Sequence, residues 1–517
     1  MRDDPSTTRA ERLLRGVLAV VAGLLTYAAF PPFALRPLAV AGTALLLVAV
    51  RGVSVRRGVL LAFLYGLAFF VPLLSWLQIG AGTHAWVVLA LLEAAFVGLS
   101  GAALVVVTRL PAWPVWAAAV FVAQEALRGR VPFGGFTWGR LGFSQDAGPL
   151  LRWSAVGGPA LTTFAVALVA GLMVVAVRHA VASARLFGRG SEGLAVAAAL
   201  AAALPVALSP LVPDAPRPER RATVALVQGN VPRLGLASLD PRQQELVIRN
   251  HVEATFELAT EVEAGRLPRP DFVVWPENST DRDPRKDAAA GALVDAAVKR
   301  VGVPVLVGAV LDRDDGEAEN AGVVWHPATG AGATYAKRHL VPFGEYVPFR
   351  ERLTPIFGRL SLVGSGFVPG AGDGGVLDIA GTRVGDVICF EVAYDDLVRD
   401  GVDDGAEVIV VQTNNASFGR SAQTRQQLAM SRVRAVEHGR TVLVAATSGV
   451  SAVIAPDGST VDESAIWTRD LLVREVGLAR SRTLATRAGA WPEAILAAMA
   501  GAAVLAGSLV ARRRAGS

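Results

Sequence analysis

Long apolar runs constrain this chain more than any other feature of its sequence. A helix needs about 20 apolar residues to cross the hydrocarbon core of a bilayer. Between residues 13 and 211, apolar runs follow one another with only short turns containing Arg or Pro between them. The sequence predicts eight membrane spans, at 14–31, 36–50, 58–79, 85–108, 111–127, 158–178, 193–211 and 491–511.

The overall composition agrees with a membrane protein. Hydrophobic residues make up 52% of the chain and charged residues 18%, whereas soluble domains carry about a quarter charged residues. The net charge of +5 is compatible with nucleic-acid binding. However, the arginines gather at the ends of the apolar runs, where membrane proteins carry them. We therefore expect a multi-pass membrane protein without a nucleic-acid partner.

The basic segments predict the orientation of the spans. Counted from an internal N-terminus, the inner segments include 51–58, 178–190 and the tail from 511, and all of them are rich in Arg, as the positive-inside rule requires. The same count places the long segment before the last span outside. We expect three parts: an N-terminal membrane domain with seven spans at 1–212, an extracytoplasmic domain at 220–484 and a C-terminal transmembrane helix at 491–511.

One loop opposes this charge bias. The segment 128–153 lies outside by the same count but contains four arginines, including Arg128 and Arg140. Arginine donates in a planar fork that suits phosphate, so one hypothesis is a binding site for phospholipid headgroups. The alternative is a loop whose limits are wrongly counted.

Residues 220–484 have a different pattern. Helical stretches occur at 239–264, 284–301 and 423–439. Short apolar runs typical of strands occur at 222–231, 271–277, 304–311, 382–390, 407–413, 441–447 and 451–456. Strands that alternate with helices predict an α/β domain.

Cys389 is the only cysteine in the sequence and ends one of the strand-like runs, in "VICFE". Backbone N–H groups at such a junction would favour a thiolate and lower the pKa of the thiol. A lone cysteine is more often a small buried hydrophobic residue. Its position alone therefore leaves both a nucleophile and a core residue open.

Metal and cofactor chemistry find no support in the sequence. One cysteine excludes an internal disulfide and a Cys-rich metal site. The six histidines have no spacing typical of metal ligands. We expect no metal and no cofactor.

Two charged residues also stand at strand ends. Glu277, in "WPENS", follows an apolar run, and Trp275 and Pro276 beside it would desolvate its carboxylate, as suits a general base. Lys337, in "YAKRH", could hold positive charge beside an oxyanion, and Glu345 could orient it. An ordinary loop acid and a solvated lysine are the alternatives.

The stretches "WPE" (275–277), "YAK" (335–337) and "VICFE" (387–391) together resemble the nitrilase superfamily in order and context. In that superfamily Glu, Lys and Cys form a catalytic triad. The resemblance implies catalytic Glu277, Lys337 and Cys389 and a four-layer α-β-β-α sandwich.

With its membrane spans, the chain resembles the bacterial apolipoprotein N-acyltransferases from about residue 14 to 511. "EALRG" (125–129), "GGFTWGRLGFSQ" (134–145), "KRHLVPFGEYVP" (337–348) and "MSRVRAVEHGR" (430–440) are similar to segments of that family. In "NASFG" (415–419), however, Ser417 stands where the family often has tryptophan.

The resemblance implies a function at the bacterial plasma membrane. A phospholipid would donate an acyl chain to Cys389, and the resulting thioester would acylate the N-terminal amine of a diacylglyceryl-cysteine on an apolipoprotein. We expect a monomer. The expected supporting residues are Glu345, Phe390 and Glu391, and the candidate substrate-binding residues are Arg128, Trp138, Arg140, Tyr346 and Phe418.

Two other interpretations of the function stay open at this stage. The chain could be a membrane-tethered amidase or nitrilase for a small molecule, or a transporter or scaffold with a degenerate domain.

The segment 343–370 is expected to form a membrane-facing lid, with an ordinary surface loop as the alternative. Glu93 and Glu125 fall within predicted spans; either is a functional candidate or a helix-packing partner, and for Glu93 we favour packing.

Overall fold

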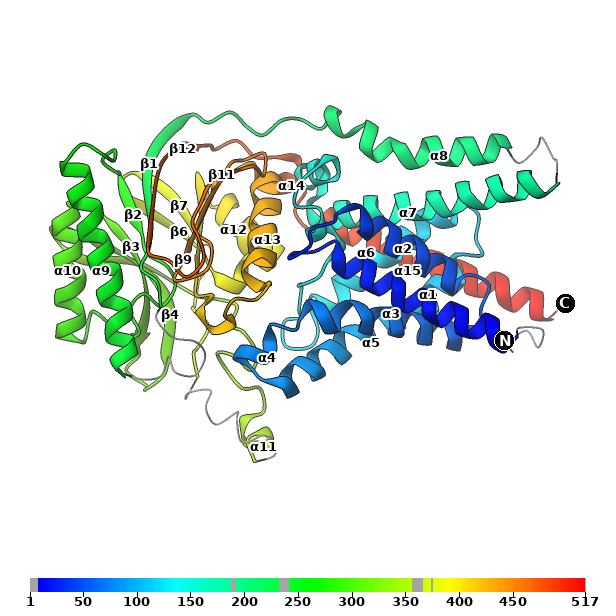
Figure 1. Ribbon diagram of the computed structural model, residues 1–517, viewed down its shortest axis with the longest axis horizontal. Helices are drawn as coiled ribbons and strands as arrows, with labels where there is room; N and C mark the ends of the chain where they lie inside the picture. Colours follow the sequence, from blue (N-terminus) through cyan, green and yellow to red (C-terminus); the bar gives the residue numbers. More distant parts are fainter. Residues whose placement is uncertain (1–7, 187–191, 232–240, 356–365, 373–374, 517) are drawn as a thin grey trace. The chain divides into compact units, whose positions relative to one another are not determined.

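The computed structural model describes residues 8–186, 192–231, 241–355, 366–372 and 375–516 (Figure 1). The chain forms two compact units. Met1–Ser75, Thr83–Pro213 and Ala488–Ser517 make up one, here called the helical unit. Trp76–Gly82 and Asp214–Arg487 make up the other, here called the α/β unit.

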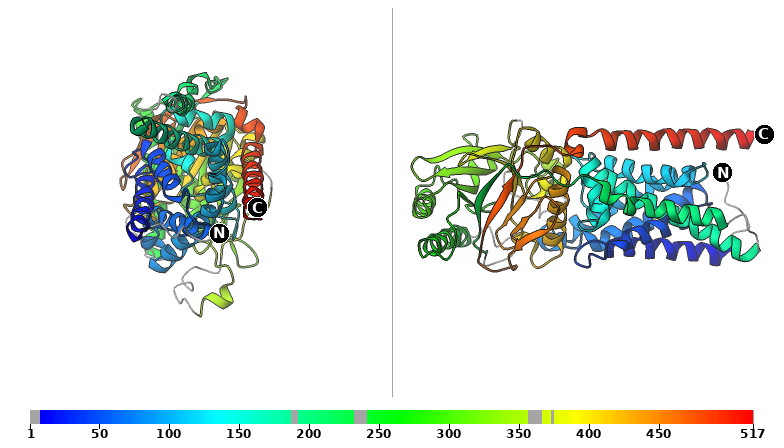
Figure 2. Two further views of the ribbon diagram at one scale, coloured as in Figure 1. Left: turned by 90° about the vertical axis from the view of Figure 1, so that its right-hand side faces the viewer. Right: turned by 90° about the horizontal axis from the view of Figure 1, so that it is seen from above.

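Long helices that run alongside one another build the helical unit (Figures 1 and 2). Small residues let α3 and α5 approach closely, since a Cβ atom on Gly101 would lie only 2.3 Å from the carbonyl oxygen of Gly58. The helices are α1 (Arg9–Ala28), α2 (Pro37–Val50), α3 (Val55–Leu73), α5 (Thr83–Val107), α6 (Trp113–Arg128), α7 (Ser154–Leu186), α8 (Glu192–Ala207) and α15 (Trp491–Gly516), with the short η1 (Leu141–Ser144), η2 (Pro149–Trp153) and η3 (Ser209–Leu211).

Five segments of the described chain are helical, long and apolar enough to cross a membrane. They are Val55–Leu73, Thr83–Val107, Pro149–Ala184, Glu192–Leu211 and Trp491–Arg513. Pro37–Val50 is a shorter apolar helix. The structure therefore contains several potential spans, while the total of eight and their orientation stay predictions.

Two six-stranded mixed sheets form the centre of the α/β unit. The first has the strand order β12-β1-β2-β3-β4-β5 and the second β11-β10-β9-β8-β7-β6. The strands are β1 (Arg220–Gln228), β2 (Phe272–Val274), β3 (Val305–Asp312), β4 (Ala318–His326), β5 (Gly330–Ala336), β6 (Val376–Ile379), β7 (Thr382–Ile388), β8 (Val408–Thr413), β9 (Val442–Ala446), β10 (Ala452–Ile454), β11 (Thr460–Glu463) and β12 (Asp470–Leu478).

The longer helices of this unit cover the outer faces of the two sheets (Figure 1). They are α9 (Pro241–Glu263), α10 (Ala288–Val301), α12 (Asp395–Asp403) and α13 (Gln423–His438). The unit also contains the short α4 (Leu77–Gly80), α11 (Arg350–Leu353), α14 (Leu484–Ala488), η6 (Cys389–Ala393) and η7 (Ala416–Phe418). α9 and α10 pack on the first sheet, and α12 and α13 on the second.

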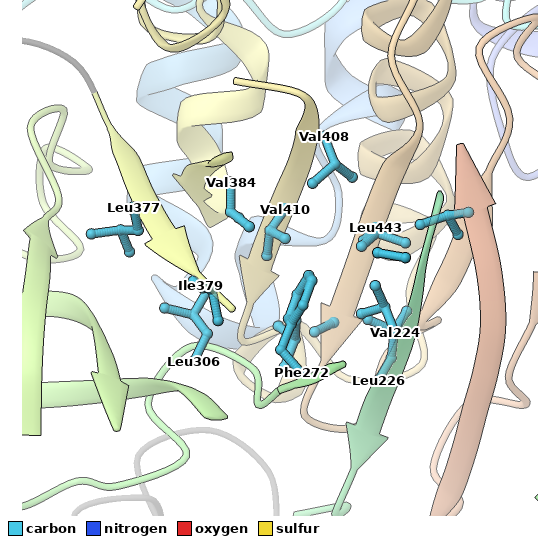
Figure 3. Close-up of a cluster of buried hydrophobic side chains, with 14 of the residues drawn as sticks. Val224, Leu226, Phe272, Leu306, Leu377, Ile379, Val384, Val408, Val410 and Leu443 are labelled. Carbon is cyan, nitrogen blue, oxygen red and sulfur yellow. The ribbon is translucent and has the colours of Figure 1, made fainter. Parts of the chain in front are cut away.

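Apolar side chains of both sheets meet between them, among them Phe272, Leu306 and Val410 (Figure 3). A second cluster joins the first sheet to α9 and α10. The predicted α-β-β-α sandwich is thereby confirmed. It is stabilised by apolar layers on both faces of the first sheet, and such burial contributes about 25 cal/mol per Å².

The strand directions bring several carboxyl ends to one edge of each sheet. β2 and β3 are parallel, and β4 and β5 each reverse direction, so β5 runs parallel to β2. In the second sheet β7 and β8 are parallel. In open α/β sheets, ligand sites form outside the carboxyl ends of parallel strands.

A buried acid interrupts the apolar layer between the sheets. Asp386 lies in β7 between Val384 and Ile388, which both belong to this layer. Neither carboxyl oxygen of Asp386 has a hydrogen-bond partner among the described residues, and the same holds for Oε1 of Gln412. A Cβ atom on Gly322 would lie 2.1 Å from Asp386 Oδ2 and 2.7 Å from Gln412 Oε1, so both oxygens border the space that this glycine leaves open.

We expect Asp386 to lower the free energy of unfolding as pH rises, because its carboxyl ionises in the unfolded chain but stays neutral in the folded protein. Burial, reinforced by the charges of Glu391 and Glu277, raises the pKa of Asp386 well above its usual range. The free energy of unfolding is highest below the unfolded pKa of about 3.9, where the carboxyl is neutral in both states. It falls as pH rises towards the folded pKa. Asp386→Asn keeps the size and cannot ionise. Its advantage in unfolding free energy should grow by up to about 1.4 kcal/mol per pH unit above pH 4.

Thermal unfolding of both proteins in detergent across this pH range measures the difference. A constant offset between the two curves would contradict the assignment of a neutral Asp386.

Candidate active site

The nucleophile candidate stands at a sharp turn. Cys389 directly follows β7 and begins η6. Its φ of 56° lies in the left-handed region, which is uncommon for residues other than glycine. Such strained positions concentrate at functional sites.

Burial dominates the environment of the thiol. Cys389 is 9% exposed. Its Sγ accepts hydrogen bonds from Thr413 Oγ1 at 3.3 Å and Gln427 Nε2 at 3.8 Å. Burial and the charge of Glu277 raise the pKa of Cys389 to about 12, although Lys337 and Thr413 act to lower it. The sequence-based expectation of a lowered thiol pKa was wrong, because it considered local N–H groups and not desolvation.

Glu277 occupies the corresponding edge of the first sheet. It follows β2 and is 4% exposed, so the expected desolvation of this carboxylate is confirmed. Asn414 donates its backbone N–H to Glu277 Oε2 at 2.7 Å. On the other oxygen, Oε1 accepts from Asn320 Nδ2 at 2.7 Å and from Lys337 Nζ at 3.2 Å.

A glycine in the neighbouring strand admits the backbone that carries Glu277. A Cβ atom on Gly308 would lie 2.1 Å from the carbonyl oxygen of Pro276 and 2.8 Å from Cα of Glu277. Ser279 Oγ also donates to the Gly308 carbonyl, at 2.8 Å. Gln412 Nε2 donates to the Trp275 carbonyl at 2.5 Å. The turn is thus fixed from both sheets.

Lys337 is buried between two carboxylates. It follows β5 and is 1% exposed. Its Nζ donates to Glu345 Oε1 at 2.8 Å as well as to Glu277. Burial lowers the pKa of Lys337, but the two carboxylates outweigh this effect and raise it well above its usual range. Glu345 therefore orients Lys337 and keeps it charged.

Asn320, in the middle of β4, is a member of this cluster that the sequence did not reveal. Its Nδ2 donates to Glu277 Oε1 and, at 3.1 Å, to Glu345 Oε1. The backbone carbonyl of Asn320 accepts the backbone N–H of Lys337 at 2.8 Å. An asparagine inside a strand gives no signal in a single sequence. Thr413, by contrast, ends β8, and the strand-end reasoning that found Cys389 could have found it.

Glu391 joins the nucleophile turn to the lysine segment. It is fully buried, and one oxygen, Oε1, accepts the backbone N–H groups of Arg338 at 2.7 Å and His339 at 3.0 Å. Its Oε2 accepts the N–H of Ile388 at 2.9 Å, and Tyr335 donates its hydroxyl to both oxygens. Burial raises the pKa of Glu391. The residue thus holds the segments on either side of the site in register.

The remaining candidates of the α/β unit lie near these residues in sequence. Phe390 follows the nucleophile and packs edge-on against Tyr394, with ring centroids 5.5 Å apart. Tyr346 is partly buried, and its carbonyl accepts the N–H of Phe343. Phe418 packs edge-on against Trp76, with centroids 4.9 Å apart. Their contacts with substrate stay predictions.

The expected lid at 343–370 lies partly outside the described residues, since 356–365 are not described. Its described flanks are tied to the site. Phe367 donates its N–H to the Glu345 carbonyl at 3.1 Å, and Gly370 donates to the Lys337 carbonyl at 2.8 Å. The described end of the segment is therefore hydrogen-bonded to the backbone of Glu345 and Lys337.

The three candidates of the helical unit are internal. Arg128, Trp138 and Arg140 are at most 2% exposed. Arg128 Nη1 pairs with Glu93 Oε2 at 2.9 Å and donates to the carbonyl of Trp138 at 2.7 Å. These contacts give Arg128 a structural role. Headgroup binding stays a prediction.

Glu93 and Glu125, the two acids within predicted spans, belong to the same internal network. Glu93 pairs with Arg128, which confirms the helix-packing interpretation of this residue. Glu125 accepts the Leu141 N–H at 2.7 Å and the Thr163 hydroxyl at 2.8 Å. Arg140 pairs with Glu493 of α15 at 2.5 Å. The network therefore fixes the loop after α6 to several helices.

Two family models match the chain. Residues 22–172 match the apolipoprotein N-acyltransferase N-terminal domain, and residues 223–486 match carbon-nitrogen hydrolase. The second match covers the α/β unit with all the residues described around Cys389. Fold and site thus define a nitrilase-superfamily enzyme with apolar helices attached.

Proteins that are similar over nearly the whole chain identify the family more closely. The apolipoprotein N-acyltransferase of Mycolicibacterium smegmatis is 39% identical over 96% of this chain and 87% of its own length. That of Azotobacter vinelandii is 31% identical, over 96% of this chain and 95% of its own length. The chain belongs to the apolipoprotein N-acyltransferase family.

Solved structures resemble the α/β unit at low sequence identity. An amidase from Nesterenkonia sp. is 19% identical and covers 52% of this chain and 92% of its own, with a TM-score of 0.36. Nit3 of Saccharomyces cerevisiae, a member of the nitrilase superfamily, is 14% identical and covers 50% and 91%, with a TM-score of 0.37.

Removing Arg128 should destabilise the helical unit. Arg128→Gln leaves the carboxylate of Glu93 buried without its partner, at an expected cost of about 3–5 kcal/mol. The matched control is Arg130→Gln, because that side chain is 60% exposed. Thermal unfolding should show a much lower midpoint for Arg128→Gln, and Glu93→Gln in the same chain should restore part of it. Equal midpoints for Arg128→Gln and Arg130→Gln would refute the structural role.

Proposed function

We propose that this enzyme transfers an acyl chain from a membrane phospholipid, through a thioester on Cys389, to the N-terminal amine of a diacylglyceryl-cysteine on apolipoproteins. The observation that carries the proposal is that Lys337 donates to Glu277 and that both charges act on Cys389, with all three residues directly after strands of the two sheets. Apolar helices in the same chain support a lipid donor. The membership of the family supports the acceptor.

In the first half-reaction, Glu277 takes the proton of the Cys389 thiol. The base is needed because the thiol, with a pKa of about 12, is protonated at rest. The sulfur attacks the ester carbonyl of the phospholipid, and a C–S bond forms. The C–O bond then breaks, and the alkoxide takes the proton from Glu277 and leaves as a lysophospholipid.

Lys337 stabilises the tetrahedral intermediate of each half-reaction. Its ammonium group stays charged between Glu277 and Glu345, so it is available to a developing oxyanion. The backbone N–H of Phe390, directly after the nucleophile, is the proposed second donor. These donors require no reorganisation during the reaction.

In the second half-reaction, the amine of the acceptor attacks the thioester. Glu277 takes a proton from the nitrogen as the C–N bond forms. The C–S bond breaks, and the proton returns to the Cys389 sulfur. The products are the N-acylated lipoprotein and the free enzyme, so the order is ping-pong.

The proposed setting is the bacterial plasma membrane, with the α/β unit on the extracytoplasmic side. The Arg-rich segments counted in the sequence support this orientation. The segment 343–370 would act as a lid against water, which otherwise hydrolyses the thioester. We propose a monomeric enzyme that needs no metal or cofactor.

Incubation of the purified protein with one defined phospholipid, without acceptor, tests the donor and the nucleophile. Mass spectrometry should find one added acyl chain on the peptide that contains Cys389, together with one lysophospholipid per enzyme. Cys389→Ala should form neither product while it still purifies from membranes. An unmodified wild-type peptide after prolonged incubation, or a modified Cys389→Ala protein, would end the proposal.

The two charged members of the triad should act on the first half-reaction. Glu277→Gln should slow acyl-enzyme formation about 10²- to 10⁴-fold through loss of the base. Lys337→Ala should slow it about 10²- to 10³-fold through loss of oxyanion stabilisation. Burst kinetics of lysophospholipid release measures both rates. A normal burst in either variant would reassign that residue.

A further inference from the structure

Two uncharged side chains hold the sulfur of Cys389. Among the described residues, Sγ accepts hydrogen bonds from Thr413 Oγ1 at 3.3 Å and from Gln427 Nε2 at 3.8 Å. Thr413 ends β8, and Gln427 lies in α13. Both residues are at most 2% exposed, so no water competes for these donors.

The amide of Gln427 has a fixed direction. Its Oε1 accepts from Asn415 Nδ2 at 2.7 Å and from Gln423 Nε2 at 3.4 Å. Asn415 Nδ2 also donates to Gln423 Oε1 at 2.9 Å, which fixes the asparagine in turn. Because donors occupy the oxygen of Gln427, its NH₂ group faces the sulfur.

The hydroxyl of Thr413 has one hydrogen and two acceptors. Cys389 Sγ lies at 3.3 Å and Gln427 Oε1 at 3.1 Å. A thiolate is a far stronger acceptor than a thioester sulfur, because it carries a full charge. The hydroxyl therefore points to the sulfur when Cys389 is ionised and to Gln427 when it is acylated.

The charged groups nearby do not by themselves favour a thiolate. Glu277 and Glu345 raise the pKa of Cys389, and Lys337 lowers it. Lys337 is already shared between the two carboxylates. When Glu277 takes the thiol proton, the negative charge passes from its carboxylate to the sulfur, and hydrogen-bond donors at the sulfur are needed to stabilise it there.

We propose that Thr413 and Gln427 are the hydrogen-bond donors that stabilise the Cys389 thiolate at the start and the end of each acyl transfer. The inference rests on the proposed role of Cys389 as nucleophile. The thiol proton goes to Glu277, and both donors keep their own protons, so no further reactant is needed.

Alkylation of the sulfur by iodoacetamide tests this role without any lipid. Cys389 is the only cysteine in the sequence, so the rate reports on one site. Thr413→Val removes the hydroxyl at nearly constant size, and Gln427→Met removes the amide. A hydrogen bond to a charged group contributes enough to change an equilibrium roughly tenfold or more. Each variant should therefore be alkylated roughly tenfold more slowly, with its rate–pH curve displaced to higher pH.

Two controls separate this role from a structural one. Thr413→Ser keeps the hydroxyl and should restore the rate. Ser431→Ala changes the same helix one turn further on and should leave the rate unchanged. Within the described part of the chain, Ser431 Oγ bonds only the backbone carbonyl of Gln427, at 3.2 Å. If Thr413→Val does not fold, Gln427→Met decides alone.

Wild-type alkylation rates in Thr413→Val and Gln427→Met would overturn the inference, even if acyl transfer falls. An equal loss of rate in Ser431→Ala would overturn it too, since the effect would then be structural. A different result would contradict the proposed function: the wild-type protein would react with iodoacetamide but would take no acyl chain from phospholipid.

Discussion

The site depends on one buried ammonium group. Lys337 lies between Glu277 and Glu345, and removing it leaves two neighbouring carboxylates without the cation that they share. Asn320 donates to both carboxylates, so β4 and the segments after β2 and β5 meet at this cation. The need of the buried Lys337 ammonium for acceptors therefore fixes the geometry of the first sheet around the site.

Hydrogen bonds in both directions join the second sheet to this cluster. The buried carboxylate of Glu391 accepts N–H groups from the lysine segment and from Ile388, just before the nucleophile. Asn414, after β8, donates to Glu277. Each sheet therefore positions a group of the other, and the apolar layer between them sets their spacing.

The sequence predicts the architecture well, because strand-like runs and their ends are local features. Three short motifs place Glu277, Lys337 and Cys389 after strands, where the structure has them, while their catalytic roles stay a prediction. The sequence does not predict Asn320 or Gln427, since their roles arise from contacts across strands and helices and carry no charge. The expected thiol pKa was wrong because desolvation depends on the whole fold. For Arg128, sequence position suggested exposure, while Glu93, 35 residues away, holds it inside.

The protonated resting state of Cys389 also bears on oxidation. Peroxides react with thiolates and hardly with thiols, so a thiol with a pKa of about 12 is a poor target between turnovers. The sequence contains no second cysteine that would convert a sulfenic acid to a reducible disulfide. Further oxidation of the sulfenic acid would be irreversible. In the proposed mechanism, the same burial that makes a base necessary therefore also protects the resting thiol from oxidation.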